Sequence, residues 1–308
     1  YGDLRDLHLS IRRQRQMCIR DSLKTDRLPL ILAEKRFNRN YPTVLFYVQV
    51  DGQPVDPNDH VNFGQSSNDI IPTSIHVSAV LAVTGQLIPS LNHAIDTIKI
   101  KAQSLKGFCK TGRTHLMDAM PIDFSEELKA WSSQLQSSKA KLNIIERKFL
   151  ELPQGGTAVG SGINAPKQFS KYFAQEMTKL LGNKCIPSKN FYHELSAQDC
   201  SVQLSGELKN LAVILTKISN DLRWMNSGPL AGLSEIELKA LQPGSSIMPG
   251  KVNPVIPEAV IMASADVIGN DVTITVAAQS GNFQLNVMLP VIAYNLLKSI
   301  NLLSGSMN

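Results

Sequence analysis

The chain has 308 residues, of which 43% are hydrophobic, so it is long and apolar enough to bury a sizeable core in one large domain or two small ones. Its formal net charge is +5, but ten of the 31 basic residues and only five of the 26 acidic residues lie in residues 1–40. The rest of the chain is therefore balanced in charge. This pattern argues against a nucleic-acid partner.

The cysteines and the apolar runs indicate the compartment. The four cysteines show no paired or metal-like spacing, which suits a reducing cytoplasm: Cys18, Cys109, Cys185 and Cys200. No uninterrupted apolar run approaches the roughly 20 residues that cross a bilayer. We therefore expect a cytoplasmic protein with no membrane partner.

The first 22 residues differ from the remainder. The run MCIRDS at 17–22 matches one reading frame of a sequencing-library adapter. The acidic residues Asp3, Asp6 and Asp21 argue against a transit peptide. We interpret residues 1–22 as a non-native, adapter-like segment.

Apolar periodicity predicts helices through most of the remaining chain. The first runs from about residue 72 to 105, with a kink at Pro89, and the second from about 125 to 150, with acidic residues in its first turn. A shorter helix covers about 167–181. Only residues 44–50 alternate as a strand does.

The helix predicted over about 195–226 has an apolar residue every three or four positions: Leu204, Leu208, Leu211, Leu215, Ile218, Leu222 and Met225. A sustained repeat of about 3.5 residues predicts packing along a nearly parallel partner helix. Two further helices are predicted over about 257–278 and 285–306. The predicted fold class is mainly α, a bundle of long helices in one domain.

The loop at 244–254, GSSIMPGKVNP, is dense in functional groups. Its glycines and prolines exclude regular structure, and it carries the paired hydroxyls of Ser245 and Ser246, the ammonium of Lys251 and the carboxamide of Asn253. Removing a proton beside a carboxylate creates an enolate-like dianion, which needs fixed cations and N–H donors. The alternative is a surface loop whose serines cap a helix.

Two other polar stretches suggest a site. The run QSSND at 65–69 places hydroxyls and a carboxamide at a predicted helix N-terminus, where a carboxylate can bind, although capping by Asn68 or Asp69 would explain part of it. His115 lies on a predicted loop, and histidine exchanges protons near neutral pH. A surface histidine, and for Glu258 an ordinary first-turn helix acid, are the alternatives.

Five blocks of the sequence resemble those of one family. The loop at 244–254 resembles the signature loop of the fumarase/aspartase superfamily, and four further blocks follow the family's order: 56–69, 112–121, 155–164 and 280–290. The resemblance covers the chain from about residue 55 to its end. Its class II fumarases carry His at the position of His115, whereas its aspartases carry Gln.

The resemblance implies a lyase, a fumarate hydratase that reversibly adds water to fumarate to give L-malate, with no metal and no organic cofactor. It implies that Ser245 is the base that removes the C3 proton, while Lys251 and Asn253 bind a carboxylate. His115, oriented by Glu258, would act through a water on the departing hydroxyl.

The resemblance further implies that a small dicarboxylate is bound by Ser66, Ser67, Asn68 and Thr114. It implies a homotetramer whose active sites are each shared between three subunits.

Two departures from the family pattern stand out. The Gly/Ser/Thr/Asn-rich loop expected before residue 56 is missing, so we interpret 23–55 as a damaged remnant of an N-terminal domain and 56–308 as the central helical bundle. Because the resemblance also implies a smaller C-terminal domain that this sequence lacks, we expect this chain alone to be inactive. In many fumarases a His precedes Pro-Asn-Asp at an accessory dicarboxylate site, but Asp56 stands there, beside Asn58 and Asp59, so we do not expect that site to bind dianions.

Two alternative functions stay open from the sequence. Aspartate ammonia-lyase belongs to the same superfamily, but His115 and the run SGNF at 280–283 argue against it. A catalytically silent helical assembly element is the other, because folds are reused without their chemistry.

Overall fold

The computed structural model describes residues 21–23, 30–38, 41–48, 62–242, 244, 247–248 and 250–308. It divides into two compact units. Unit 1 consists of Tyr1–Ser78 and Leu152–Leu195, and unit 2 consists of Ala79–Glu151 and Ser196–Asn308.

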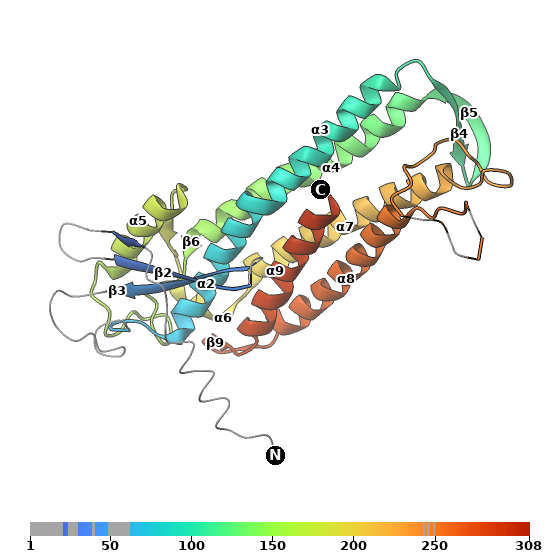
Figure 1. Cartoon of the computed structure of the whole chain (residues 1–308). Helices are drawn as coiled ribbons and strands as arrows, with labels where there is room; N and C mark the ends of the chain where they lie inside the picture. The colour runs from blue at the N-terminus through green and yellow to red at the C-terminus, as the bar shows by residue number, and fades with distance from the viewer. Residues whose placement is uncertain are drawn as a thin grey trace. The chain divides into compact units, whose positions relative to one another are not determined.

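Unit 2 is a bundle of long helices. Its members are α3 (Ile88–Ser104), α4 (Phe124–Glu146), α7 (Asp199–Met225), α8 (Val255–Ala278) and α9 (Leu289–Ser306). Helix α3 packs on α4, α4 on α7, α7 on α8, and α8 on α9 (Figure 1). The prediction of a mainly α, long-helix bundle is confirmed.

The leucine stripe of α7 forms the centre of this bundle. Leu204, Leu208 and Leu211 are at most 1% exposed, and of the predicted stripe only Leu222 is half-buried. A buried polar link joins α7 to α8, because Asp271 accepts hydrogen bonds from Ser205 Oγ at 2.7 Å and Lys209 Nζ at 2.6 Å. The 3.5-residue repeat thus predicted the core-facing side of this helix correctly.

The first long helix contains a widened turn. Helix α2 (Ser67–Ala82) is followed by a π-helical turn, η2 (Val83–Leu87), and then by α3. The kink predicted at Pro89 takes the form of this π-helical turn, because proline has no N–H to donate to the carbonyl four residues earlier. The helix also begins five residues before the predicted start at residue 72, with Pro72 inside it.

The helix predicted over 195–226 is interrupted. A short helix, α6 (Phe191–Ser196), precedes α7, which begins only at Asp199. Helix α9 likewise starts later than predicted, because β8 (Gly281–Asn282) and β9 (Leu285–Asn286) pair just before it. Helix α4 agrees with the prediction, and the 3₁₀ turn η3 (Arg147–Leu150) completes it.

A β-hairpin between α3 and α4 was not predicted. Strand β4 (Cys109–Thr114) pairs antiparallel with β5 (Met117–Asp123). Most of β5 is exposed, so neither strand shows the apolar alternation by which strands are recognised in a sequence.

Asp123 then caps α4, accepting a hydrogen bond from Ser125 N at 2.8 Å. Hydrogen bonds from Ser125 and from the Gly107 N–H lower the pKa of Asp123.

Unit 1 combines short strands and helices. Strands β1 (Asp21–Leu23), β2 (Leu30–Asn38) and β3 (Tyr41–Val48) form an antiparallel sheet, and β3 includes most of the predicted strand at 44–50. Helix α5 (Phe169–Leu181) agrees with the predicted helix at 167–181. The short strands β6 (Glu151–Leu152) and β7 (Ile186–Pro187) pair with each other, and they lie before and after α5 in the chain.

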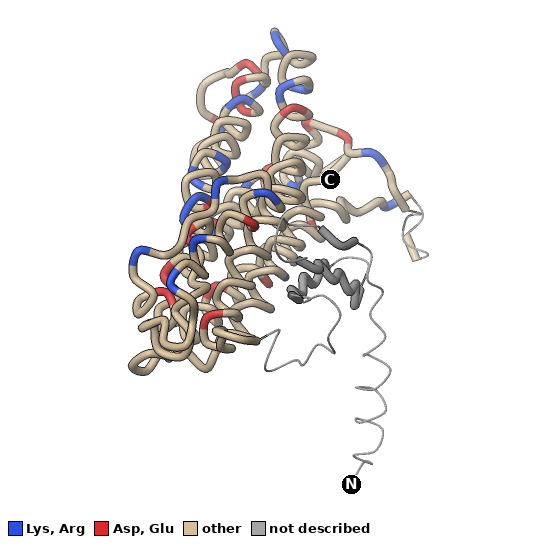
Figure 2. The backbone as a smooth tube through the Cα atoms, turned by 90° about the vertical axis from the view of Figure 1, so that its left-hand side faces the viewer, with Lys and Arg blue, Asp and Glu red and all other residues tan. Residues whose placement is uncertain are grey.

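Charge is mixed along the helices, and α8 is apolar. Figure 2 shows basic and acidic residues interspersed along the described chain, as its balanced charge predicts.

Two stretches, Ser67–Ser104 and Val255–Ala278, are long and apolar enough to cross a membrane, a test that core helices of soluble proteins also pass. In α8, apolar side chains also face outward: Met262 is 66% exposed and Val272 is 60% exposed.

Truncating the stripe of α7 tests this account of the core. Leu208 is fully buried, so we expect Leu208→Ala to lower the free energy of unfolding by about 2 to 5 kcal/mol, through lost apolar burial and the cavity left behind. Val213→Ala, on the same helix at a side chain that is 54% exposed, is the control and should change it by about 0.5 kcal/mol or less. Denaturant unfolding measures both, and equal losses would contradict a core centred on the stripe.

Candidate functional site

His115 lies at the tip of the hairpin in unit 2. With Leu116 it forms the two-residue turn between Thr114 and Met117, and both turn residues have positive φ, 53° and 60°. Such turns match the twist of the paired strands but strain side chains other than glycine and asparagine. His115 and Thr114 are both exposed. His115, which the sequence predicted to lie on a loop, therefore lies in a strained turn.

The described part of the 244–254 loop brings together two predicted carboxylate-binding residues. Lys251 Nζ donates a hydrogen bond to Asn253 Oδ1 at 2.8 Å, and both side chains are exposed. The loop doubles back on itself, since a Cβ on Gly244 would stand 3.0 Å from the Lys251 carbonyl oxygen. Ser245 and its neighbour Ser246 lie outside the described residues.

Glu258 sits in the first turn of α8, where its Oε1 is 3.9 Å from Arg223 Nη2 of α7. Within the described part of this single chain, no hydrogen bond or ion pair joins Glu258 to His115. The hairpin reaches the same end of α7, because Lys110 Nζ lies 3.4 Å from Met225 Sδ. The hairpin and the start of α8 therefore share one end of unit 2 (Figure 1).

In unit 1, Ser66, Ser67 and Asn68 form the start of α2. Ser66 is the N-cap, since its Oγ accepts a hydrogen bond from Asn68 N at 3.2 Å, whereas the sequence suggested Asn68 or Asp69 for this role. Asn68 Nδ2 donates to the Ala158 carbonyl at 2.7 Å, and Ser67 is exposed. A cavity of about 780 Å³ adjoins Ser66 and is lined by residues of 62–66 and 157–164.

Asp69 holds this start of the helix to the glycine-rich block at 155–164. The carboxylate is fully buried and accepts three backbone hydrogen bonds, from Ser66 N at 2.9 Å, Gly155 N at 3.0 Å and Thr157 N at 2.9 Å. Burial raises the pKa of Asp69, and the three N–H groups oppose part of that rise. Sequence reasoning missed this role, although Ser followed three residues later by an acid is the signature of a capping box.

Gly155 explains why the glycine-rich block fits there. Its φ is +110°, and a Cβ would stand 2.7 Å from Ser170 Cβ, so no other residue can occupy this position without a shift. The block in turn presents the N–H groups of Gly155 and Thr157 to Asp69. The two sequence blocks therefore form one local structure.

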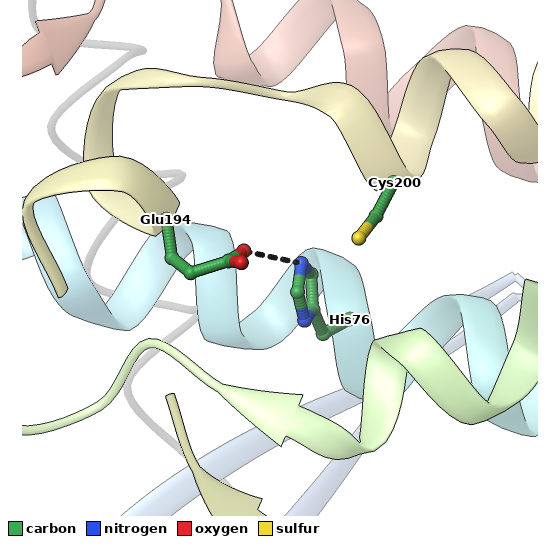
Figure 3. A group of neighbouring side chains, drawn as sticks. All are labelled: His76, Glu194 and Cys200. Carbon is green, nitrogen blue, oxygen red and sulfur yellow. Dashed lines mark ion pairs between the residues drawn. The ribbon is translucent and has the colours of Figure 1, made fainter. Parts of the chain in front are cut away.

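The predicted accessory residues Asp56, Asn58 and Asp59 lie outside the described residues. Among the possible metal ligands of unit 1, His76 of α2 is buried and its Nε2 lies 3.9 Å from Glu194 Oε2 of α6. Figure 3 shows this pair; the Cys200 side chain drawn with it belongs to unit 2. Two ligands are fewer than the three or four protein groups of ordinary zinc sites.

Comparison with known proteins identifies the family. A family model described as a lyase matches residues 32–269. A Pseudomonas aeruginosa protein named fumarate hydratase class II 2 is 57% identical over 254 residues, which are 82% of this chain and 56% of that protein. A class II fumarate hydratase of Xylella fastidiosa is 58% identical over 252 residues, covering 82% of this chain and 53% of its own length.

Solved structures agree with these relatives. A class II fumarase from Schistosoma mansoni superposes with a TM-score of 0.81 at 40% identity, covering 82% of this chain and 56% of that one. The chain belongs to this lyase family, and its bundle is of the fumarase/aspartase type, as the resemblance predicted. The relatives quoted by name are class II fumarate hydratases and a class II fumarase, and the chain spans about half the length of the curated relatives it matches.

Replacing Asp69 tests its role in holding the two blocks of unit 1 together. We expect Asp69→Ala to lower the free energy of unfolding by about 2 to 4 kcal/mol, because buried N–H groups would lose their acceptor. Asp96→Ala, at an exposed carboxylate on α3, is the matched control and should cost about 0.5 kcal/mol or less. Chemical denaturation compares them, and an Asp69 variant as stable as the control would contradict this role.

Proposed function

We propose that the protein is a class II fumarate hydratase, a lyase that reversibly adds water to fumarate to give L-malate. The observation that carries the proposal is the exposed, hydrogen-bonded pair Lys251 and Asn253 in the 244–254 loop, together with His115, which is exposed on a strained turn and so open to groups of a neighbouring subunit. The relatives named as class II fumarate hydratases support it. Because the aspartases of the superfamily carry Gln in place of His115, we prefer hydration to deamination.

In the direction of fumarate, the reaction of L-malate begins with removal of a proton from C3. Ser245 takes the proton from C3, and the negative charge moves onto the adjacent carboxylate as an enolate-like dianion. Lys251 stabilises that dianion by charge, and Asn253 does so by donating its amide N–H groups, since its carbonyl oxygen already faces Lys251. The C2 hydroxyl then leaves as water.

His115 supplies the proton that the departing hydroxyl needs. It acts through a bound water, and Glu258 orients its imidazole and raises its basicity. Because Glu258 faces Arg223 in the single chain, we infer that its partner histidine comes from another subunit. Ser66, Ser67, Asn68 and Thr114 bind the substrate carboxylates, with the N-terminus of α2 adding its dipole.

We propose a homotetramer in which each active site takes residues from three subunits. The outward apolar face of α8 supports this assembly, since a helix that is apolar on all sides is normally covered. The exposure of His115, Lys251 and Ser67 in one chain fits sites that are completed by neighbours. We further propose a cytoplasmic location, no metal or organic cofactor, and no dianion bound at Asp56, Asn58 and Asp59.

The activity is tested on a completed protein. In it, residues 1–55 are replaced by the N-terminal domain of a class II fumarate hydratase and that enzyme's C-terminal domain follows residue 308, so that the predicted segments 1–22 and 23–55 are both removed. We expect fumarate hydration, trace aspartate deamination at most, and loss of turnover in Ser245→Ala with an unchanged melting temperature. Deamination as fast as malate dehydration would instead assign an aspartate ammonia-lyase.

Ser246→Ala is the matched control for the base, and it should keep most of the activity. An inactive Ser246→Ala beside an active Ser245→Ala would move the base by one residue. A completed protein that assembles but turns over neither substrate would favour the silent assembly element.

The outward face of α8 gives a test of assembly. Val272→Glu places a charge on an apolar side chain that is 60% exposed in one chain, so we expect light scattering to show a smaller oligomer than the parent. Gln134→Glu, at an exposed polar position of α4, is the control and should leave the mass unchanged. A parent chain that is already monomeric would contradict the assembly proposal.

A further inference from the structure

A cluster of ion pairs in unit 2 fixes the base of the hairpin that carries His115. Glu235, in the connection after α7, forms ion pairs with two cations of β4: Arg113 Nη1 contacts its Oε1, and Lys110 Nζ lies 3.1 Å from its Oε2. Lys110 also pairs with Glu127 of α4. The side chains of Lys110, Glu235 and Arg113 are 9%, 12% and 20% exposed. These charges are therefore paired mostly out of water, where Coulomb attraction is stronger than at the surface.

An irregularity in the hairpin lets one carboxylate reach both cations. In a regular strand, residues three apart point to opposite faces. The register of β4 shifts between Thr111 and Arg113, which allows Lys110 and Arg113 to face the same way. Because they face the same way, Lys110 and Arg113 can both contact Glu235.

Glu235 is itself held firmly. Its backbone N donates to the Met225 carbonyl at 2.8 Å, and Ile236 N donates to the same carbonyl at 3.2 Å. Leu238 N donates to Asn226 Oδ1 at 2.8 Å. Although burial opposes it, hydrogen bonds from Arg113 and Lys110 lower the pKa of Glu235, so the group is ionised near neutral pH. A fixed negative charge thus stands at the C-terminal end of α7.

Among the described residues, no ion pair comparable to that of Arg113 involves the hairpin tip at 114–117. His115 is exposed, and Leu116 and Met117 are 64% and 70% exposed. In the described part of the chain, Arg113 is the last ion-paired residue before the tip, and it directly precedes Thr114 and His115. The contact that holds the Arg113 side chain therefore fixes the position of the residue at which the hairpin tip begins.

We propose that Glu235 is a positioning residue for the reaction: through Arg113 it fixes the hairpin, and thereby the places of Thr114 and His115. This inference rests on the proposed hydratase function. A displacement of about 1 Å at a reacting group can cost up to about 10²-fold in rate, so loss of this contact should be visible in turnover.

The kinetic test uses Glu235→Gln in the completed protein, with Glu237→Gln as the matched control at an exposed carboxylate two residues further on. We expect Glu235→Gln to lower kcat about 10-fold and Glu237→Gln to leave it unchanged. In a His115→Asn background, the same Glu235→Gln change should lower kcat by clearly less than in the parent, because only Thr114 remains of the two groups that it positions. An equal loss in both backgrounds would mean general destabilisation and overturn the proposal.

A second measurement does not depend on activity. Hydrogen–deuterium exchange of residues 109–123 in the 308-residue chain should become faster in Glu235→Gln than in Glu237→Gln, while exchange of the α7 core stays the same. Unchanged exchange in the hairpin would overturn the proposal. If the completed protein fails to hydrate fumarate, the proposed function fails, and this measurement still decides whether Glu235 holds the hairpin.

Discussion

Burial of the leucine stripe of α7 is the constraint on which unit 2 depends. The stripe is long and narrow, so the helices that cover it must run along α7 rather than across it. Helices α4, α8 and α9 do so, and their connections consequently fall at the ends of the bundle. One of these ends holds the hairpin with His115 and the connection with Lys251 and Asn253. The chemistry that we propose would therefore lie at the end of the helical core, on the connecting loops.

Two carboxylates hold the polar groups of the candidate site in place. Asp69 joins the start of α2 to the glycine-rich block in unit 1, and Glu235 joins the hairpin to the end of α7 in unit 2. Both are carboxylates largely removed from water: Asp69 accepts hydrogen bonds from backbone N–H groups, and Glu235 is paired with two cations. Such groups are costly to bury unless their partners are in place, so each favours a single local arrangement.

The proposed assembly explains two observations together: the exposure of the candidate residues and the exposure of apolar side chains on α8. In one chain, His115 and Lys251 face solvent, and so does a row of apolar side chains on α8. A second copy that covers the apolar row would also remove water from groups at the end of the same helix. Exclusion of water strengthens the electrostatic stabilisation that a dianionic intermediate requires.

The sequence by itself determined the helices, the loop and the family. Apolar spacing is a local property, so the stripe from Leu204 to Met225 was readable, and glycine and proline mark the 244–254 loop through their own backbone restrictions. Only the tertiary structure decided the hairpin around His115, the acceptor role of Asp69 and the contact of Glu235 with Arg113. These depend on pairs of groups up to 122 residues apart in the chain, and such pairing leaves no periodic signal in the segment that carries either partner.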